Sequence, residues 1–202
     1  EAWLCRAFGV AKQQDWPVAP FTLQADSAGQ MQAENHYWLR ADPVHLRLER
    51  NQVVLADSQI FRITSEEAKQ LADLLNRHFA ADGCDLPPHH GATARQELVF
   101  LPLTPDRWYL RVTATPALQT HALSAVAGQD IHALLPSGTD NMRWQGLFNE
   151  VQMLLHEHPL NQAREARGEL AINGIWLWGG GIMPQLGGCS YTQVWSNAVL
   201  PR

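Results

Sequence analysis

Alternating apolar and polar residues predict the first strands of this chain. Residues 44–49 read VHLRLE, the period-two pattern of a half-buried strand. The polar residues 49–52 then predict a turn, and residues 53–56 predict the returning strand of a hairpin. A second strand pair is predicted at residues 97–101 and 107–112, joined by a turn at Thr104–Pro105–Asp106.

The clearest helix signal is the segment ITSEEAKQLADLLNRHF, from Ile63 to Phe79. Thr64 and Glu67 have the spacing of a capping box, in which each side chain accepts a hydrogen bond from a free backbone N–H group. Apolar residues then recur every three or four positions, so one face of this helix is expected to be buried. They are Ala68, Leu71, Leu74, Leu75 and Phe79.

A second long helix is predicted from Asn141 to His158, with Asp140 or Thr139 as its N-cap. Pro159 should interrupt it, and a short exposed turn of helix that ends at Gly168 should follow. The apolar face of the long helix comprises Trp144, Leu147, Phe148, Val151, Leu154, Leu155 and His158.

The two ends of the chain carry weaker signals. Residues 3–10 predict a short helix, and Pro17 and Pro20 favour extended or turn conformations in the stretch that follows. Near the other end, IWLWGGG at residues 175–181 predicts a last core strand before a glycine-rich tail. Its glycines permit positive φ and close packing. They do not form a phosphate-binding loop, because that motif needs a lysine and a helix after the glycines.

The order of elements is hairpin, helix, strand pair, helix and strand. This order predicts an α+β fold, with a mainly antiparallel or mixed β-sheet and two long amphipathic helices packed on it. We divide the chain into an N-terminal extension, residues 1–36, and an α+β domain, residues 37–202. The sequence begins with Glu1 rather than methionine, so we expect it to be a fragment of a longer protein.

The composition predicts a folded protein and argues against several classes of function. Of 202 residues, 46% are hydrophobic and 17% charged, which suffices for a sizeable core. A net charge of −5 argues against a nucleic-acid partner. No apolar run approaches the roughly 20 residues of a membrane span, and no basic segment followed by an apolar one begins the chain. We therefore expect no membrane partner and a cytoplasmic location.

The sequence lacks motifs for metal binding and nucleophilic catalysis. His156 and His158 are two residues apart on the predicted helix and point in different directions, so they cannot share one ion. Neither HExxH nor GxSxG occurs, and Cys5, Cys84 and Cys189 lie far apart without a CxxC pair. We predict no metal, no cofactor and no catalytic residue in this chain.

Arginine is the residue type that most invites a binding function. The chain has thirteen arginines and two lysines, and the guanidinium group binds carboxylates or phosphates through two parallel hydrogen bonds. If the strands lie side by side, two or three guanidinium groups could converge on one anion. The alternative is that they are solvated surface charges in weak ion pairs. The candidates are Arg47, Arg107, Arg111 and Arg164.

Several blocks of the chain together resemble known families. DPVHLRLERNQVVLAD, ITSEEAKQLADLLN, RWYLRVT and LFNEVQMLLHEHPLNQAREARGELAINGIWLWGGG occur in one order and spacing. They resemble uncharacterised bacterial proteins described as regulatory, of the RpfE type, over nearly the whole chain. From residue 42 to residue 181 they are also similar to the inserted, substrate-covering domain of archaeal-type cofactor-independent phosphoglycerate mutase.

The second resemblance implies where the chemistry of such a protein would lie. The mutase belongs to the alkaline phosphatase superfamily and uses two divalent metal ions and a serine that becomes phosphorylated. These parts belong to the surrounding domain, and no residue here matches them. The inserted domain contributes basic residues to the phosphoglycerate, which implies anion binding by Arg47 and Arg107. His158, Asn161 and Arg164 match the HPLN block, which implies either anion binding or only the fixing of a helix end.

These observations lead to one functional hypothesis and two alternatives. The hypothesis is a non-catalytic binding or regulatory module for a small phosphorylated or carboxylate anion, such as an anionic metabolite. The first alternative is part of an active phosphoglycerate mutase or phosphatase. The second is a protein-interaction module, since eight tryptophans could leave an apolar patch for a homodimer or a protein partner.

Overall fold

A computed structural model describes residues 2–31, 33, 36–81 and 97–185 of the chain. Most of the expected glycine-rich tail lies outside these residues. The strands are β1 (Tyr37–Glu49), β2 (Gln52–Ala56), β3 (Leu98–Thr104), β4 (Arg107–Val112) and β5 (Gly174–Gly181). The helices are α1 (Ala2–Ala7), α2 (Val18–Asp26), α3 (Ser65–Ala81), α4 (Leu123–Val126), α5 (Asn141–His156) and α6 (Pro159–Ala166). Among the described residues, no helix is long and apolar enough to cross a bilayer.

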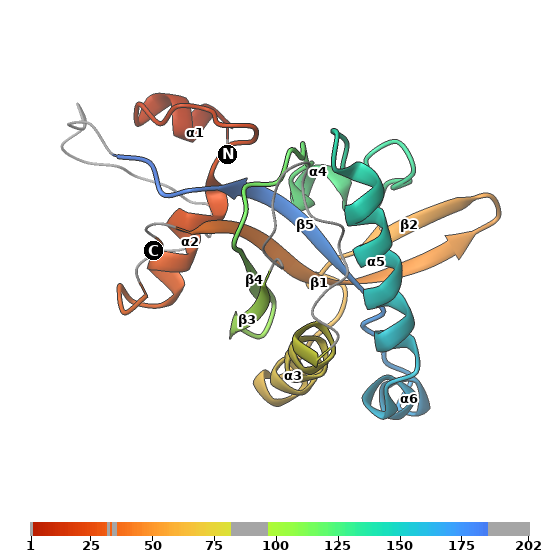
Figure 1. The fold of residues 1–202 in the computed structure, drawn as a ribbon. Coiled ribbons are helices and arrows are strands. Elements are labelled where there is room, and N and C mark those ends of the chain that lie inside the picture. Colours follow the sequence, from red (N-terminus) through yellow and green to blue (C-terminus); the bar gives the residue numbers. More distant parts are fainter. Residues whose placement is uncertain (1, 32, 34–35, 82–96, 186–202) are drawn as a thin grey trace.

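Strand β1 is the centre of the sheet because it pairs with three other strands (Figure 1). Residues 37–40 pair with β4, residues 38–44 with β5 on the other side, and residues 45–49 with β2. Strand β3 completes the sheet beside β4. Every pairing is antiparallel, which confirms the predicted α+β class and the mainly antiparallel sheet.

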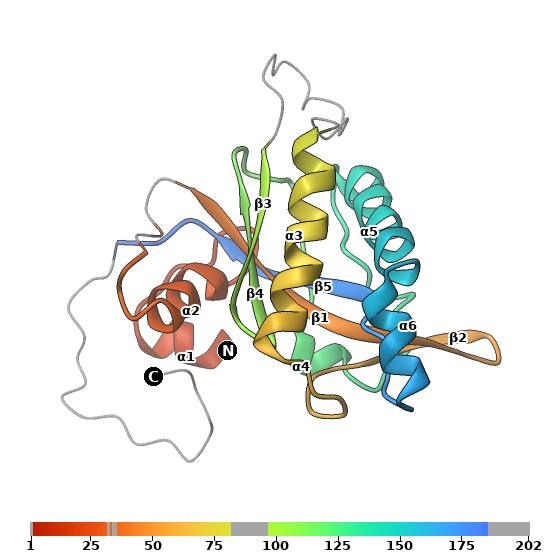
Figure 2. The same cartoon turned by 90° about the horizontal axis from the view of Figure 1, so that it is seen from below.

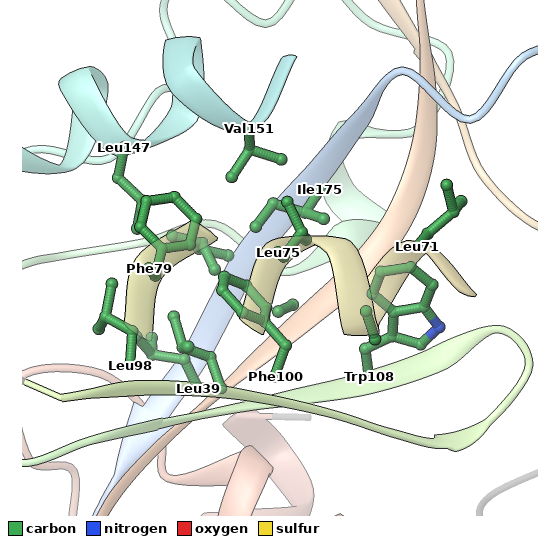
Figure 3. Close-up of a cluster of buried hydrophobic side chains, with 14 of the residues drawn as sticks. Leu39, Leu71, Leu75, Phe79, Leu98, Phe100, Trp108, Leu147, Val151 and Ile175 are labelled. Carbon is green, nitrogen blue, oxygen red and sulfur yellow. The ribbon is translucent and has the colours of Figure 1, made fainter. Parts of the chain in front are cut away.

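The two faces of the sheet are covered by different elements. Odd-numbered residues of β1, such as Leu39 and Ala41, pack in the largest apolar cluster with α3 and α5 (Figures 2 and 3). Even-numbered residues lie on the opposite face, where Trp38 packs with α2 and Val44 packs with Val126 of α4. Strands alternate their side chains in this way, so each face has its own core.

The two long helices follow the predicted periodicity. At the start of α3, the Thr64 N–H donates to Glu67 Oε2 at 2.9 Å and the Glu67 N–H donates to Thr64 Oγ1 at 3.2 Å, which confirms the capping box. In α5, the predicted face is buried at Trp144, Leu147, Val151 and Leu155 and half-buried at Phe148 and Leu154.

Asp140 occupies the N-cap position of α5, as predicted, but its side chain does not cap the helix. Its Oδ2 instead accepts a hydrogen bond from the Ala117 N–H at 2.7 Å. The carboxylate therefore fastens the preceding loop to the start of α5.

The expectation of extended or turn structure around Pro17 and Pro20 is wrong. Pro17 is the N-cap of α2, and Pro20 lies in its first turn. The first N–H groups of a helix have no carbonyl partner within it, so a proline there loses no hydrogen bond. The two prolines therefore mark the start of a helix.

The glycines at the end of β5 belong to the strand and allow close packing. Gly179 has a φ of +65°, which favours glycine. A Cβ atom at Gly180 would collide with Tyr37 and Leu39, and one at Gly181 would collide with Pro17. These observations confirm the prediction that the glycines end a strand and permit positive φ and close packing.

Candidate functional site

The six residues predicted to bind an anion lie in three parts of the fold. Arg47 is on β1 beside β2, Arg107 and Arg111 are on β4, and the other three are at α6. Within the described residues, no hydrogen bond or ion pair joins one of these parts to another through the predicted side chains. The three predicted residues at α6 are His158, Asn161 and Arg164.

Strand register separates Arg47 from the two arginines of β4. Arg111 pairs with Trp38, so it lies on the face of the even-numbered β1 residues, and Arg107 shares that face as predicted. Arg47 is an odd-numbered residue of β1 and lies on the opposite face. The sheet therefore does not bring these three arginines together.

Arg47 forms a surface ion pair along its own strand. Its side chain is 64% exposed, and its Nη2 donates to Glu49 Oε1. An exposed pair of this kind contributes little to stability. Arg47 therefore keeps most of its hydrogen-bonding capacity open to solvent.

Arg107 holds α2 against the sheet. Its Nε and Nη2 donate to the two carboxylate oxygens of Asp26, both at 2.8 Å. The Tyr109 hydroxyl donates to the same carboxylate at 2.6 Å. The hydrogen bond to Asp26 raises the pKa of the Arg107 guanidinium above its usual value. Two of the five N–H donors of Arg107 are thus used inside the protein.

Arg111 is less completely paired than Arg107. Its Nη2 lies 3.4 Å from Glu97 Oε2, and the Glu97 side chain is 63% exposed. Its Nε is buried and donates to no acceptor among the described residues. Of the two β4 arginines, Arg111 has the weaker contact with a carboxylate, at 3.4 Å against 2.8 Å for Arg107.

Asn161 and His158 fix the path of the chain around α6. Asn161 is 2% exposed, and its Nδ2 donates to the carbonyls of Leu155 and Ile172. Its Oδ1 accepts from the Ile172 N–H at 2.8 Å, so the amide links α5 to the segment before β5. His158 caps α6 by accepting the Leu160 N–H at 3.2 Å, and burial lowers the pKa of its imidazole.

Arg164 is a buried guanidinium whose nitrogens all donate to protein groups. Its side chain is 1% exposed. Nε donates to the Leu170 carbonyl at 2.9 Å, and Nη2 donates to the Arg62 carbonyl at 2.8 Å. Nη1 lies 3.0 Å from both carboxylate oxygens of Glu67. These contacts join α6 to the start of α3.

A groove of about 440 Å³ opens above this buried pair. It lies between the loop at residues 60–64 and the turn at residues 167–170. The half-exposed Arg167 pairs there with Glu169 at 2.9 Å and with Glu67 at 3.3 Å. Burial raises the pKa of the Glu67 carboxyl, but hydrogen bonds from Thr64 and Arg164 outweigh it and leave the pKa below its usual value. The groove therefore carries charges of both signs.

The face of the sheet with the even-numbered β1 residues carries a buried ion pair, Arg40 with Asp42, that was not predicted from the sequence. Asp42 is 1% exposed and accepts hydrogen bonds from Arg40 at 2.7 Å and from Trp178 Nε1 at 2.7 Å. The Arg40 guanidinium lies 5.2 Å from the ring centre of Tyr109 and 5.3 Å from that of Trp178. Burial raises the pKa of the Asp42 carboxyl. The sequence signal for this ion pair is an arginine and an aspartate two residues apart in an otherwise apolar strand.

The described part of the chain contains no set of side chains that could bind a metal ion. Residues 2–31, 33, 36–81 and 97–185 contain no group of three or more His, Cys, Asp or Glu side chains that could hold a metal ion. The metal-dependent chemistry implied by the family resemblance is therefore not assigned to these residues.

Comparison with known proteins decides the family. Residues 22–161 match the family described as 2,3-bisphosphoglycerate-independent phosphoglycerate mutase. The chain belongs to this family. The match confirms the predicted relation to cofactor-independent phosphoglycerate mutase, and the resemblance to regulatory proteins of the RpfE type stays a prediction.

Curated members of the mutase family are similar to most of this chain. A probable 2,3-bisphosphoglycerate-independent phosphoglycerate mutase from Geobacter sulfurreducens is 27% identical over 164 residues, which cover 81% of this chain and 38% of the relative. 2,3-bisphosphoglycerate-independent phosphoglycerate mutase 2 from Methanothermobacter thermautotrophicus is 28% identical over 133 residues, which cover 65% of this chain and 30% of the relative. The chain thus spans about a third of the length of these relatives.

A solved structure shares the fold. The cofactor-independent phosphoglycerate mutase from Thermoplasma acidophilum superposes with a TM-score of 0.55 at 15% sequence identity. The superposition covers 84% of this chain and 43% of that one. At this identity the likeness shows a common fold for this part of the two proteins.

Proposed function

We propose that this chain is a non-catalytic binding module that covers a small phosphorylated or carboxylate ligand in a mutase-related protein. The observation that carries the proposal is the family match over residues 22–161, a range that contains the exposed guanidinium of Arg47 and the partly exposed one of Arg111. A module of this size can supply ligand contacts while another part of a protein supplies the reaction.

The contacts of the arginines indicate which side chains suit such a ligand. Arg47 is exposed and has a single partner, and the partly exposed Arg111 has one weak contact, with Glu97 at 3.4 Å. Either guanidinium can bind an anion without breaking a buried contact. Arg107, Arg164 and Asn161 are already used by protein groups, so anion binding by them would require rearrangement. We therefore assign the ligand contacts to Arg47 or Arg111, each on its own face of the sheet.

Calorimetric titration with 3-phosphoglycerate tests this proposal. We expect saturable binding that is absent with glycerate, which lacks the phosphate. Loss of a charged hydrogen bond costs about 1.5–3 kcal/mol, so either Arg47→Gln or Arg111→Gln should weaken binding about tenfold or more. The control is Lys69→Gln, an exposed cation on α3 paired with Asp73. Affinity equal to that of the wild type in both arginine variants would refute the assignment, whereas equally tight binding of glycerate would show that the carboxylate and not the phosphate is recognised.

A second candidate function is part of an active mutase. It is favoured by the names of the relatives, which are phosphoglycerate mutases. In that case the longer protein that contains this sequence should interconvert 2- and 3-phosphoglycerate, and chelation of divalent metal should stop the reaction. Turnover by that protein would replace the non-catalytic proposal, whereas ligand binding without turnover would support it.

A further inference from the structure

A small cavity lies where the N-terminal segment crosses the end of β5. Its volume is about 170 Å³. Asp15 and Trp16 form one wall, Thr120 forms another, and Trp178 and Gly179 of β5 form the third. The apolar side chains of Val18 and Ala122 complete the lining, and among the described residues no arginine or lysine takes part. The cavity is below the usual 300–1,000 Å³ of sites for drug-sized ligands, so it suits a group of a few heavy atoms.

Asp15 brings a buried negative charge to this cavity. The residue is 8% exposed. Its Oδ2 accepts hydrogen bonds from both the N–H and the hydroxyl of Thr120, and Thr120 Oγ1 in turn accepts the Gly179 N–H at 3.2 Å. Among the described residues, nothing donates a hydrogen bond to Oδ1 of Asp15. One oxygen of the carboxylate therefore holds the fold together, and the other lacks a donor.

The environment of Asp15 leaves its charge only partly compensated. Burial raises the pKa of the Asp15 carboxyl, while the hydrogen bonds from Thr120 and the nearby Lys12 and His121 act in the opposite direction. Neither Lys12 nor His121 forms an ion pair with it within 4.0 Å among the described contacts. Asp15 Oδ1 is not among the buried atoms that lack a partner, so it is open to solvent, and a ligand with N–H donors can reach it.

Two indole rings make the same cavity suitable for a cation. Trp178 is 7% exposed and uses its Nε1–H on Asp42, so its polar edge is already occupied. Trp16 is half-buried. Each ring already has a guanidinium at cation–π distance, with Arg6 at 5.4 Å from the Trp16 ring centre and Arg40 at 5.3 Å from that of Trp178, so a ligand cation can use only the ring surface that faces the cavity. Tryptophan faces attract cations through the ring quadrupole.

We propose that the cavity formed by Asp15, Trp16, Thr120, Trp178 and Gly179 binds a small organic cation with N–H donors, of the primary ammonium or guanidinium class. The cation would donate to Asp15 Oδ1 and lie against the indole rings. This site is separate from the proposed anion contacts, because its residues are different and its ionisable lining residue is a carboxylate.

Nuclear magnetic resonance titration of the chain tests this site. The probes are methylammonium and guanidinium chloride at non-denaturing concentration, with tetramethylammonium, which lacks N–H donors, and acetate, which is an anion, as comparison ligands. We expect methylammonium or guanidinium to shift the Thr120 and Gly179 amide signals and the Trp178 indole signal saturably. Tetramethylammonium should bind about tenfold more weakly, and acetate or 3-phosphoglycerate should not shift these signals.

Two variants separate the site from general salt effects. Asp15→Asn keeps an acceptor for Thr120 but loses the charge, so it should weaken cation binding at least about tenfold. Asp73→Asn removes a partly exposed carboxylate on α3 and should leave binding unchanged. The proposal is overturned by the absence of saturable shifts, by equal affinity in Asp15→Asn, or by equal binding of tetramethylammonium. If Asp15→Asn does not fold, two measurements still test the proposal. They are cation binding by Trp16→Leu and the comparison of methylammonium with tetramethylammonium on the wild-type chain.

Discussion

Arg164 shows how this protein accommodates a charge in its interior. The guanidinium donates to two backbone carbonyls and to Glu67, and its side chain is 1% exposed. Glu67 also accepts the Thr64 N–H, so one carboxylate serves both the cap of α3 and the buried arginine. The pair therefore belongs to a set of contacts that is complete only when α3, α6 and the loop before α3 are all in place.

Removal of this guanidinium should be costly. Breaking a buried ion pair typically destabilises a protein by about 3–5 kcal/mol. In Arg164→Ala, Glu67 keeps its contact with Arg167, but the carbonyls of Leu170 and Arg62 lose their donor. We expect a loss of about that size in the free energy of unfolding of Arg164→Ala, measured by urea denaturation. The matched control is Arg47→Ala, which removes an exposed ion pair and should cost less than about 1 kcal/mol. Similar, small losses in both variants would show that the Arg164 contacts do not stabilise the fold.

At the scale of elements, the sequence predicts what depends on neighbours along the chain. The capping box of α3, the apolar face of α5 and the hairpin turn after Glu49 are local patterns, and all appear in the structure. Helix α2 was missed because proline was interpreted as a helix breaker, although Pro20 lies in the first turn.

The candidate site was less predictable because its contacts join residues far apart in the chain. The bond from Arg164 to Glu67 spans 97 residues, and that from Arg107 to Asp26 spans 81. A sequence shows which residues are arginines but not which carboxylate each will meet. Strand alternation did predict that Arg107 and Arg111 share a face, and the register confirms it.

The end of β5 offers a direct test of close packing in an element. A methyl group at Gly180 would collide with Tyr37 and Leu39, so Gly180→Ala should lower the free energy of unfolding by about 1–3 kcal/mol. Gly146 is the matched control because it lies on the exposed side of α5 with no atom near its added Cβ. Gly146→Ala should raise stability by up to about 1 kcal/mol, owing to the better helix propensity of alanine. Thermal and urea unfolding measure both changes. Opposite signs are required, and a stabilised Gly180→Ala would contradict the packing described for β5.

At the scale of the whole molecule, residues before β1 contact both the segment before α4 and the residue after β5. The side-chain amide of Gln13 donates to the Ile182 carbonyl at 2.7 Å and accepts the Ile182 N–H at 3.0 Å. Gln14 accepts the Leu118 N–H at 3.0 Å, and Asp15 holds Thr120. The family match also begins at residue 22, within α2. The predicted division at residues 36 and 37 therefore raises the question of whether the second part can fold alone.

Deletion of residues 1–36 should answer that question. The deletion removes Leu23 and Asp26 of α2, so Trp38 and Tyr109 lose apolar cover and Arg107 loses its carboxylate. Exposure of large apolar side chains costs about 1.5–3 kcal/mol for each, and a domain is typically stable by only 5–15 kcal/mol. We expect residues 37–202 to show no cooperative unfolding transition by circular dichroism, or a transition at a markedly lower temperature than that of the whole chain. Deletion of residues 1–9 removes α1, where Trp3 is 75% exposed, and should cost far less. A fragment of residues 37–202 that melts at the temperature of the whole chain would show that the N-terminal segment is a dispensable extension. In that case the contacts of residues 1–36 would form on the folded domain without stabilising it.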